Sequence, residues 1–228
     1  MDYIAHIRQS DGAVQTVQDH LREVSELSGI SGAKMGVQHL AALAGLLHDM
    51  GKFTDEFRTY IEEAHANPDR PPRKGSVDHS TAGGKLLHSR YHSSKAKGAV
   101  KETAEWIANC IISHHQGIRD YIPPEGESPY LKRVLNDKLP GYEQAEQHFY
   151  RHVPRQELDR LFIHAAVEWK ELNHKITQHA LPPIASSLSL KYIFSCLIDA
   201  DRSNSREFEE QETHIPIPDY KPLLVYIR

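Results

Sequence analysis

The sequence predicts an all-α domain. Apolar residues recur at helical spacing in almost every periodic stretch of the 228 residues, and no segment before the C-terminal tail alternates convincingly as a strand would. The chain contains no internal repeat and no low-complexity tract. Its length suits one large domain that can bury a substantial core.

The predicted helices are bounded by capping residues and helix breakers. The first carries an apolar stripe from Val14 to Leu27 and ends at Gly29. The second, at residues 37–50, is nearly all apolar, and we expect it to be central. Gly51 follows it and fits the position where a positive φ is commonly required. Further helices are predicted to begin at residues 54–56 and to span residues 80–91, 99–113, 130–135, 142–152, 156–178 and 185–200.

The composition limits the classes of function. With 39% hydrophobic and 25% charged residues the chain resembles an ordinary soluble protein, and no apolar run approaches the ~20 residues of a membrane helix. The N-terminus lacks the basic and apolar regions of a signal peptide. Cys110 and Cys196 lie in apolar helical patterns, and the simplest interpretation is that both are buried, reduced thiols. We therefore expect a cytoplasmic protein with no membrane contact. We also expect the chain to be a monomer.

The formal net charge of −4 argues against a protein that depends mainly on contacts with nucleic-acid backbone. Any such binding should be local. The segment with Arg70, Arg73 and Lys74 and the segment from Arg90 to Lys101 are candidates, although a solvated mixed-charge surface is the simpler interpretation of each.

An ordered set of histidines and aspartates predicts a metal centre. His48 and Asp49 end the apolar second helix, where a carboxylate beside an imidazole is costly unless it binds an ion. His20 precedes this pair, and His79 and the vicinal His114–His115 pair follow it. A late acidic pair completes the set, formed by Asp199 and Asp201.

The two late aspartates are two residues apart, so they lie on nearly opposite faces of a helix and only one should bind a metal easily. Asp201 continues the stripe of Leu190, Phe194 and Leu197, and we prefer it. Several of the 16 histidines are background. We expect His39 and His88 to be satisfied helix residues and expect the following histidines, which have polar neighbours, to lie on the surface: His6, His65, His92, His174 and His214.

Imidazole and carboxylate ligands without thiolates suit Mn, Fe, Co, Ni or Zn better than Ca, and they argue against a cysteine-rich structural zinc site. Seven ligands are enough for two ions that share Asp49 as a bridge. Two ions ~3.5–4 Å apart can hold a hydroxide and clamp both oxygens of a phosphodiester during in-line displacement.

The motifs resemble the HD superfamily of metal-dependent phosphohydrolases and, within it, the HD nuclease domain of the CRISPR-associated nuclease-helicase of type I interference systems. The resemblance spans essentially the whole chain. It is carried by Thr16 to Val24 around His20, Gly45 to Phe53 with Phe57, Asp78-His79-Ser80-Thr81-Ala82-Gly83, Ser113-His114-His115-Gln116-Gly117 and Leu197 to Arg202. The His-Ser-Thr-Ala-Gly and His-His-Gln-Gly motifs discriminate best from other HD phosphohydrolases.

This resemblance implies a helical bundle around a central dinuclear site. One ion would be held by His20, His48, Asp49 and the late aspartate, Asp201, and the other by Asp49, His79, His114 and His115. Asp49 and Lys52 would be catalytic, with Lys52 neutralising charge on the scissile phosphate, although a helix-terminal lysine favoured by the helix dipole is the plain alternative. The expected cofactors are two divalent ions, of Mn, Fe, Co, Ni or Mg.

The resemblance further implies a nuclease, endo- or exonucleolytic, that cuts single-stranded DNA in antiviral defence. Its partners would be a helicase domain, in cis or in trans, and the CRISPR RNA-guided surveillance complex. Residues 1–205 would form the HD nuclease domain, and residues 206–228 a linker or tail leading to the helicase or partner, as expected if the chain is cut from a longer protein. No Gly-x-x-x-x-Gly-Lys-Ser/Thr phosphate loop occurs in the chain itself.

Two alternatives stay open at this point. The chain could be an HD phosphohydrolase that acts on a small nucleotide, which would require a closed pocket with groups that recognise a base and a sugar. It could also be a non-catalytic binding module in which the metal is structural. The surplus of ligands argues against the second alternative, because a structural site closes with four.

Overall fold

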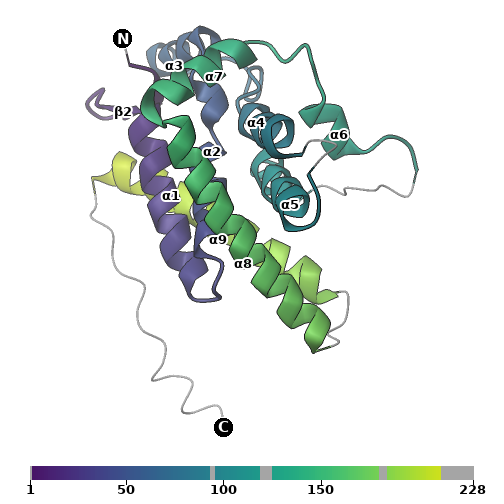
Figure 1. Cartoon of the computed structure of the whole chain (residues 1–228). Helices are drawn as coiled ribbons and strands as arrows, with labels where there is room; N and C mark the ends of the chain where they lie inside the picture. Colours follow the sequence, from purple (N-terminus) through teal and green to yellow (C-terminus); the bar gives the residue numbers. More distant parts are fainter. Residues whose placement is uncertain (1, 93–95, 119–124, 180–183, 212–228) are drawn as a thin grey trace, which may run out of the picture.

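Helices dominate the computed structural model of the chain, which describes residues 2–92, 96–118, 125–179 and 184–211 (Figure 1). The predicted all-α fold class is therefore confirmed, with one small sheet added. The elements are β1 (Ile4–Ile7), β2 (Val14–Thr16), α1 (Val17–Ala33), α2 (Gln38–Leu47), the single 3₁₀ turn η1 (Met50–Lys52), α3 (Asp55–Ala66), α4 (Thr81–Tyr91), α5 (Ala99–Ser113), α6 (Pro129–Val134), α7 (Tyr142–His152), α8 (Arg155–Gln178) and α9 (Ile184–Glu210).

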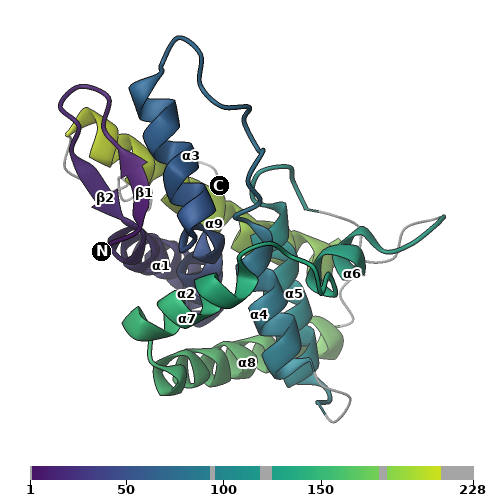
Figure 2. The same ribbon diagram turned by 90° about the horizontal axis from the view of Figure 1, so that it is seen from above.

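The N-terminal hairpin was not predicted. Strands β1 and β2 pair antiparallel, with His6 opposite Gln15 and Ile7 opposite Val14. Val14 therefore belongs to a strand, and α1 begins only at Val17, where the hydroxyl of Thr16 accepts a hydrogen bond from the backbone N–H of Asp19 at 3.2 Å. Strands of three and four residues are too short to show a clear alternation, and their pairing is not visible in local sequence. Figure 2 shows this hairpin beside α3 and the C-terminal end of α9.

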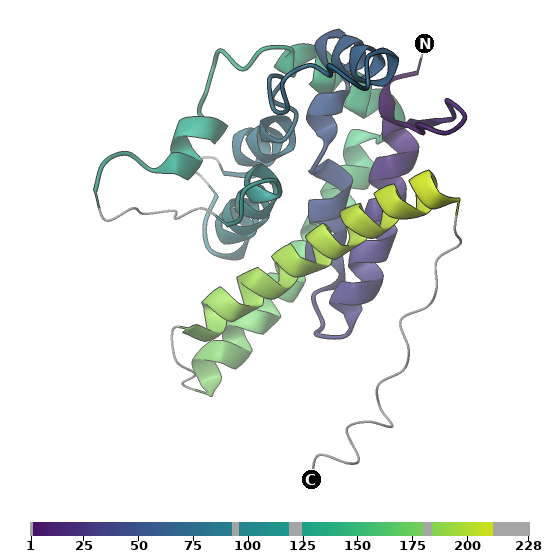
Figure 3. The ribbon, with the colours of Figure 1, turned by 180° about the vertical axis from the view of Figure 1, so that it is seen from behind.

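Helix α2 is central, as its apolar sequence predicts. It packs against α1, α5, α8 and α9, and Leu40, Leu43 and Leu47 are fully buried. Helix α8 crosses one side of the α1–α2 pair in Figure 1, and α9 crosses the other side in Figure 3. The helix pair α1 and α2 thus forms the middle layer of the bundle.

Glycines explain how closely α1 and α2 approach each other. The prediction that α1 ends at Gly29 is wrong, because the helix continues to Ala33. A Cβ at Gly32 would lie 2.6 Å from the carbonyl oxygen of Val37, and one at Gly45 would lie 2.7 Å from that of Val24. The absence of these side chains lets the two backbones come into direct contact.

Several predicted boundaries match the structure and others shift. Helix α7 covers the predicted residues 142–152, and α4 and α5 end at Tyr91 and Ser113 as expected. Helix α3, for which only the start was predicted, extends through His65 to Ala66, and α9 continues beyond its predicted end at Ala200 to Glu210. The expected linker start at residue 206 therefore falls inside α9, and the division into domain and tail stays a prediction. The apolar tail at residues 222–227 lies outside the described residues.

Cys110 and Cys196 are free and buried, as predicted. Within the described ranges, no helix is both long enough and apolar enough to cross a lipid bilayer.

Candidate metal centre

Five separate parts of the chain converge on one cluster of imidazoles and carboxylates. His20 lies in the second turn of α1, and His48 and Asp49 directly follow α2. His79 precedes α4, the His114–His115 pair follows α5, and Asp201 lies in α9. All seven predicted ligands are brought together, in two groups whose candidate ligand atoms lie within 4.8 Å of one another.

The first group consists of His20, His48, Asp49 and Asp201. The Nε2 atoms of His20 and His48 lie 3.2 Å apart, and both face Oδ2 of Asp49, at 3.4 and 3.3 Å. Oδ1 of Asp201 lies 3.5 Å from each of these nitrogens. Asp199, the other late aspartate, is exposed and belongs to neither group.

The second group consists of Asp49, His79, His114 and His115. It uses the other oxygen of the shared carboxylate, since Oδ1 of Asp49 lies 3.3 Å from Nε2 of His114 and 3.9 Å from Nε2 of His79. The Nε2 atoms of His79 and His115 are 2.6 Å apart. The two oxygens of Asp49 therefore face different groups, which is the arrangement of a bridging ligand.

The donor set fits divalent ions. Oδ1 of Asp49 and Nε2 of His114 are buried and have no hydrogen-bond partner among the described residues. A buried polar atom without a partner costs ~1–3 kcal/mol, so such atoms need a ligand to satisfy them. Both belong to the second group and lie 3.3 Å apart, as two ligands of one ion would.

Four of the histidines are oriented by their second ring nitrogen. Nδ1 of His48, His79 and His114 lies within hydrogen-bond distance of a backbone carbonyl oxygen, of Gly45 at 2.8 Å, Val77 at 3.2 Å and Ile111 at 2.7 Å, respectively. Nδ1 of His20 lies 2.7 Å from Oδ1 of Asn204. A neutral imidazole that donates Nδ1–H to an oxygen presents a free lone pair at Nε2, which is the form that binds metals.

The carboxylates at the centre remain ionised although they are buried. Burial alone would raise the pKa of Asp49, but His48 and Lys52 hold that pKa well below its ordinary value. The pKa of Asp201 is likewise lowered, because hydrogen bonds with His20 and His48 outweigh the effect of burial. Burial lowers the pKa of His79 and of His115 to about 4, so both are neutral near pH 7.

His48 differs from the other histidines. Burial favours its neutral form, but Asp49 and Asp201 together outweigh burial and raise the pKa of His48 to about 10. The proton on His48 therefore balances part of the negative charge of the two carboxylates. A divalent ion bound by the first group would displace that proton, so binding there releases a proton.

A family model described as "Cas3, HD domain" matches residues 8–192. This range covers most of the chain and includes every residue of the two groups except Asp201.

The chain belongs to the Cas3 HD-domain family.

Membership of this family makes the chain a CRISPR-associated nuclease domain of the metal-dependent hydrolase type, with a role in a CRISPR system that includes a helicase. A search of the curated proteins found no match. Because the family match ends at residue 192, the position of Asp201 at the centre comes from the geometry of α9 alone.

Lys52 of this Cas3 HD domain lies inside the cluster. Its ammonium group is 2.8 Å from Oδ2 of Asp49 and 3.3 Å from the backbone oxygen of Ala5, which accepts a hydrogen bond from it. The residue is 5% exposed. Under the plain alternative, Lys52 would be a solvated side chain at a helix terminus and would be far more exposed than this.

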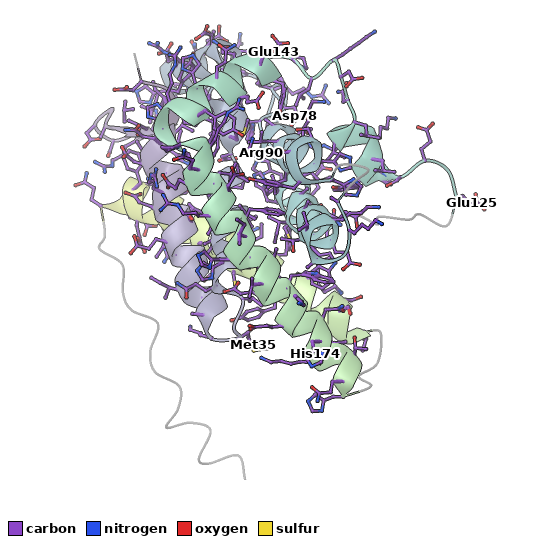
Figure 4. All side chains as sticks on the ribbon, in the orientation of Figure 1. Met35, Asp78, Arg90, Glu125, Glu143 and His174 are labelled. Atoms are coloured by element: carbon purple, nitrogen blue, oxygen red, sulfur yellow. The ribbon has the colours of Figure 1, made fainter. Side chains whose placement is uncertain are left out.

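The segment before α4 is fixed by polar contacts. Asp78 accepts hydrogen bonds from the backbone N–H groups of Ser80 and Thr81, both at 3.1 Å, and caps the start of the helix. The guanidinium of Arg133 pairs with Asp78 at 3.1 Å. Figure 4 labels Asp78 near α4, far from Met35 at the other end of the molecule. These contacts hold His79, the neighbour of Asp78, in place.

Two residues at this centre were not predicted from the sequence. His6 was expected on the surface, but the hairpin places its ring 4.8 Å from that of His20, and burial lowers its pKa to about 2. Asn204 lies in the part of α9 that was not predicted to be helical. By contrast His174, also expected on the surface, is exposed near the end of α8 (Figure 4).

Proposed function

We propose that the chain is a two-metal nuclease that hydrolyses single-stranded DNA during type I CRISPR interference. The observation that carries this proposal is the division of the Asp49 carboxylate, whose Oδ1 faces one histidine group and whose Oδ2 faces the other. One aspartate between two such groups suits two ions, whereas a structural metal site closes with four ligands.

We assign the ligands as the resemblance implies. His20, His48 and Asp201 would complete one ion site with Asp49, and His79, His114 and His115 the other. When bound, two such ions lower the pKa of a water molecule and neutralise charge on the phosphate. The histidine-rich set favours Mn, Fe, Co or Ni over Mg, which prefers oxygen ligands.

Lys52 would provide fixed positive charge at this centre. Its ammonium lies on Oδ2 of Asp49, and its position is maintained by the carbonyl of Ala5 in β1. A buried cation next to the bridging carboxylate can also neutralise charge on a phosphate that enters the centre. Lys52 is therefore our candidate for the group that stabilises charge during phosphodiester hydrolysis.

The substrate would approach from the exposed side of the cluster. His20 and His48 are fully buried, whereas the side chains of His79 and Asp201 are 15% and 19% exposed and His115 is exposed. A flexible single strand can bend a phosphate into such a recessed centre. Duplex DNA is stiff over ~150 bp and cannot do so cheaply. The net charge of −4 also provides no general attraction for duplex.

Duplex destruction would then need a helicase, in cis or in trans, and a CRISPR RNA-guided complex that displaces one strand. The nuclease domain itself would act as a monomer, because a single chain supplies both ligand groups.

The test is a digestion experiment on protein stripped with a chelator and reloaded with Mn²⁺, Co²⁺ or Ni²⁺. Its substrates are matched single-stranded and blunt duplex DNA without ATP, together with nucleoside triphosphates and cyclic nucleotides. We expect the single strand to be cut, the duplex to stay largely intact and the nucleotides to be unchanged. Equal rates on both DNAs would refute the preference for single strands, and turnover of nucleotides alone would identify a nucleotide phosphohydrolase.

The matched variants are Asp49→Asn and Asp199→Asn. The first keeps the shape of the side chain but removes the bridging charge, so it should lose both ions and nuclease activity. The second changes an exposed aspartate outside the two groups and should behave as the unchanged protein does. Near-unchanged cleavage by Asp49→Asn would show that Asp49 is no bridge.

A further inference from the structure

His20 is oriented differently from its fellow ligands. Nδ1 of His48, His79 and His114 faces a backbone oxygen, but Nδ1 of His20 lies 2.7 Å from the side-chain oxygen of Asn204. Both residues are buried, with His20 at 0% and Asn204 at 5% exposure. The orientation of His20 therefore depends on a side chain that a substitution can change.

The amide of Asn204 can face His20 in only one way. Its Nδ2 donates a hydrogen bond to Oε2 of Glu23 at 2.6 Å. An ionised carboxylate only accepts hydrogen bonds, so Glu23 requires the NH₂ group on its side and leaves Oδ1 to face His20. Since Oδ1 only accepts as well, Nδ1 of His20 must carry the proton.

Gln15 of β2 supports the same arrangement. Its Nε2 donates to Oδ1 of Asn204 at 2.9 Å and to Oε2 of Glu23 at 2.8 Å, so it contacts the acceptor on each residue. Gln15 lies in β2, Glu23 in α1 and Asn204 in α9. Helices α1 and α9 are in contact, and α9 crosses α1 in Figure 3. Three elements thus fix one amide group.

We propose that Asn204 is a positioning residue for the metal centre, held by Glu23 so that the imidazole of His20 keeps its proton on Nδ1 and its lone pair on Nε2. This inference rests on the proposed function, because it gives His20 a role as a ligand. Helix α9 then contributes twice to one ion, directly through Asp201 and, one turn later, through Asn204.

The effect should be confined to one of the two ions. His20 belongs to the group with His48 and Asp201, whereas His79, His114 and His115 form the other group without it. Substitution of residues that orient metal ligands typically reduces metal affinity about 10–100-fold. Loss of Asn204 should therefore reduce the affinity for one Mn²⁺ ion by this factor and leave the affinity for the second unchanged.

The experiment measures Mn²⁺ binding to the full chain by calorimetry, with single-strand cleavage in parallel. Asn204→Leu has a similar size but no acceptor, so one of two ions should bind about 10–100-fold more weakly. The double variant Asn204→Asp with Glu23→Gln moves the carboxylate next to His20 and the amide to position 23. It should regain most of the lost affinity, because the carboxylate introduced at position 204 accepts from His20 and the amide introduced at position 23 donates to that carboxylate.

The double variant still tests the proposal if Asn204→Leu folds poorly. The proposal would be overturned if Asn204→Leu bound Mn²⁺ with the affinity of the unchanged protein. It would also be overturned if the double variant bound Mn²⁺ no more tightly than Asn204→Leu does. Asp199→Asn, on the same helix but exposed, should bind both ions normally. His20→Ala separates the two hypotheses. If it binds both ions normally, the proposed function fails; if it loses one ion while Asn204→Leu loses none, only the present inference fails.

Discussion

Gly83 connects the packing of the fold to the geometry of the metal centre. It lies in the first turn of α4, directly against Leu47, the last residue of α2. A Cβ at Gly83 would lie 2.0 Å from the carbonyl oxygen of Leu47 and 3.1 Å from its Cβ, whereas ordinary contact begins at 3.4 Å. To accept Ala, the two backbones must separate by about 1.4 Å (3.4 − 2.0), because no flexible side chain can move away.

The size of the effect follows from two opposing contributions. Overpacking costs ~1–3 kcal/mol, and a backbone neighbour places Gly83→Ala at the upper end. Replacing Gly by Ala in a helix returns about 1 kcal/mol. The net loss in the free energy of unfolding is then about 2 kcal/mol or more. At roughly 2–4 °C for each kcal/mol in a protein of this size, the Tm should fall by at least about 4–8 °C.

The same substitution should weaken metal binding. Leu47 is followed by His48 and Asp49, and His79 lies four residues before Gly83, so separation of α2 from α4 pulls Asp49 away from His79. Thermal unfolding in chelator, followed by Mn²⁺ titration, measures both effects. Gly29→Ala is the matched control, because its Cβ would meet nothing closer than 3.4 Å and should raise stability by up to about 1 kcal/mol. A Gly83→Ala protein that melts like the unchanged chain and binds both ions normally would refute the reasoning.

Two further predictions concern single side chains. Asp201→Asn should lose one of two ions and most nuclease activity, whereas Asp199→Asn should keep both; metal analysis by mass spectrometry decides between them, and the reverse pattern would reassign the late ligand. His88 should contribute to acid sensitivity, because burial lowers its pKa to about 4 from an unfolded value near 6.5. Between these pH values the unfolded chain binds more protons, so stability is full above pH 6.5 and falls as the pH drops towards 4, by at most about 3 kcal/mol for this group. Denaturant unfolding at pH 7 and pH 4.5 should show a smaller loss for His88→Gln than for the unchanged chain, and equal losses would exclude this role.

The candidate ligands could be selected from the sequence because their chemistry is visible in the residue types. An imidazole next to a carboxylate at the end of an apolar helix needs an explanation wherever it occurs, and His48–Asp49 is such a pair. The preference for Asp201 over Asp199 rests on the helical period and on the stripe of Leu190, Phe194 and Leu197. The structure brings together all seven predicted ligands in the predicted two groups, while their role as ligands stays a proposal.

The sequence correctly indicates that glycine is needed at position 51, but the physical reason predicted for it is wrong. The sequence predicts a positive φ after α2, but Gly51 is not among the glycines with positive φ in the described residues. It lies in η1, where a Cβ would be 2.4 Å from the carbonyl oxygen of His79, and its N–H donates to that oxygen at 3.2 Å. Glycine is needed here because two backbones touch. Such a contact between distant segments leaves no local signal in the sequence.

The residues that sequence analysis missed depend on one non-local feature, the contact between the hairpin and the end of α9. By composition, the charged stretch after Asn204 resembles a linker, and on local sequence alone the helix should end at Ala200. Arg8 of the hairpin turn alters this outcome, since its guanidinium lies 4.6 Å from the ring of Phe208 and donates to the backbone oxygen of that residue at 2.7 Å. The extra helical turns carry Asn204 to His20, and the same hairpin carries His6 and Gln15 to the centre. Removing the Arg8 contact should therefore loosen the last turns of α9 and, through Asn204, the orientation of a metal ligand that Arg8 itself never touches.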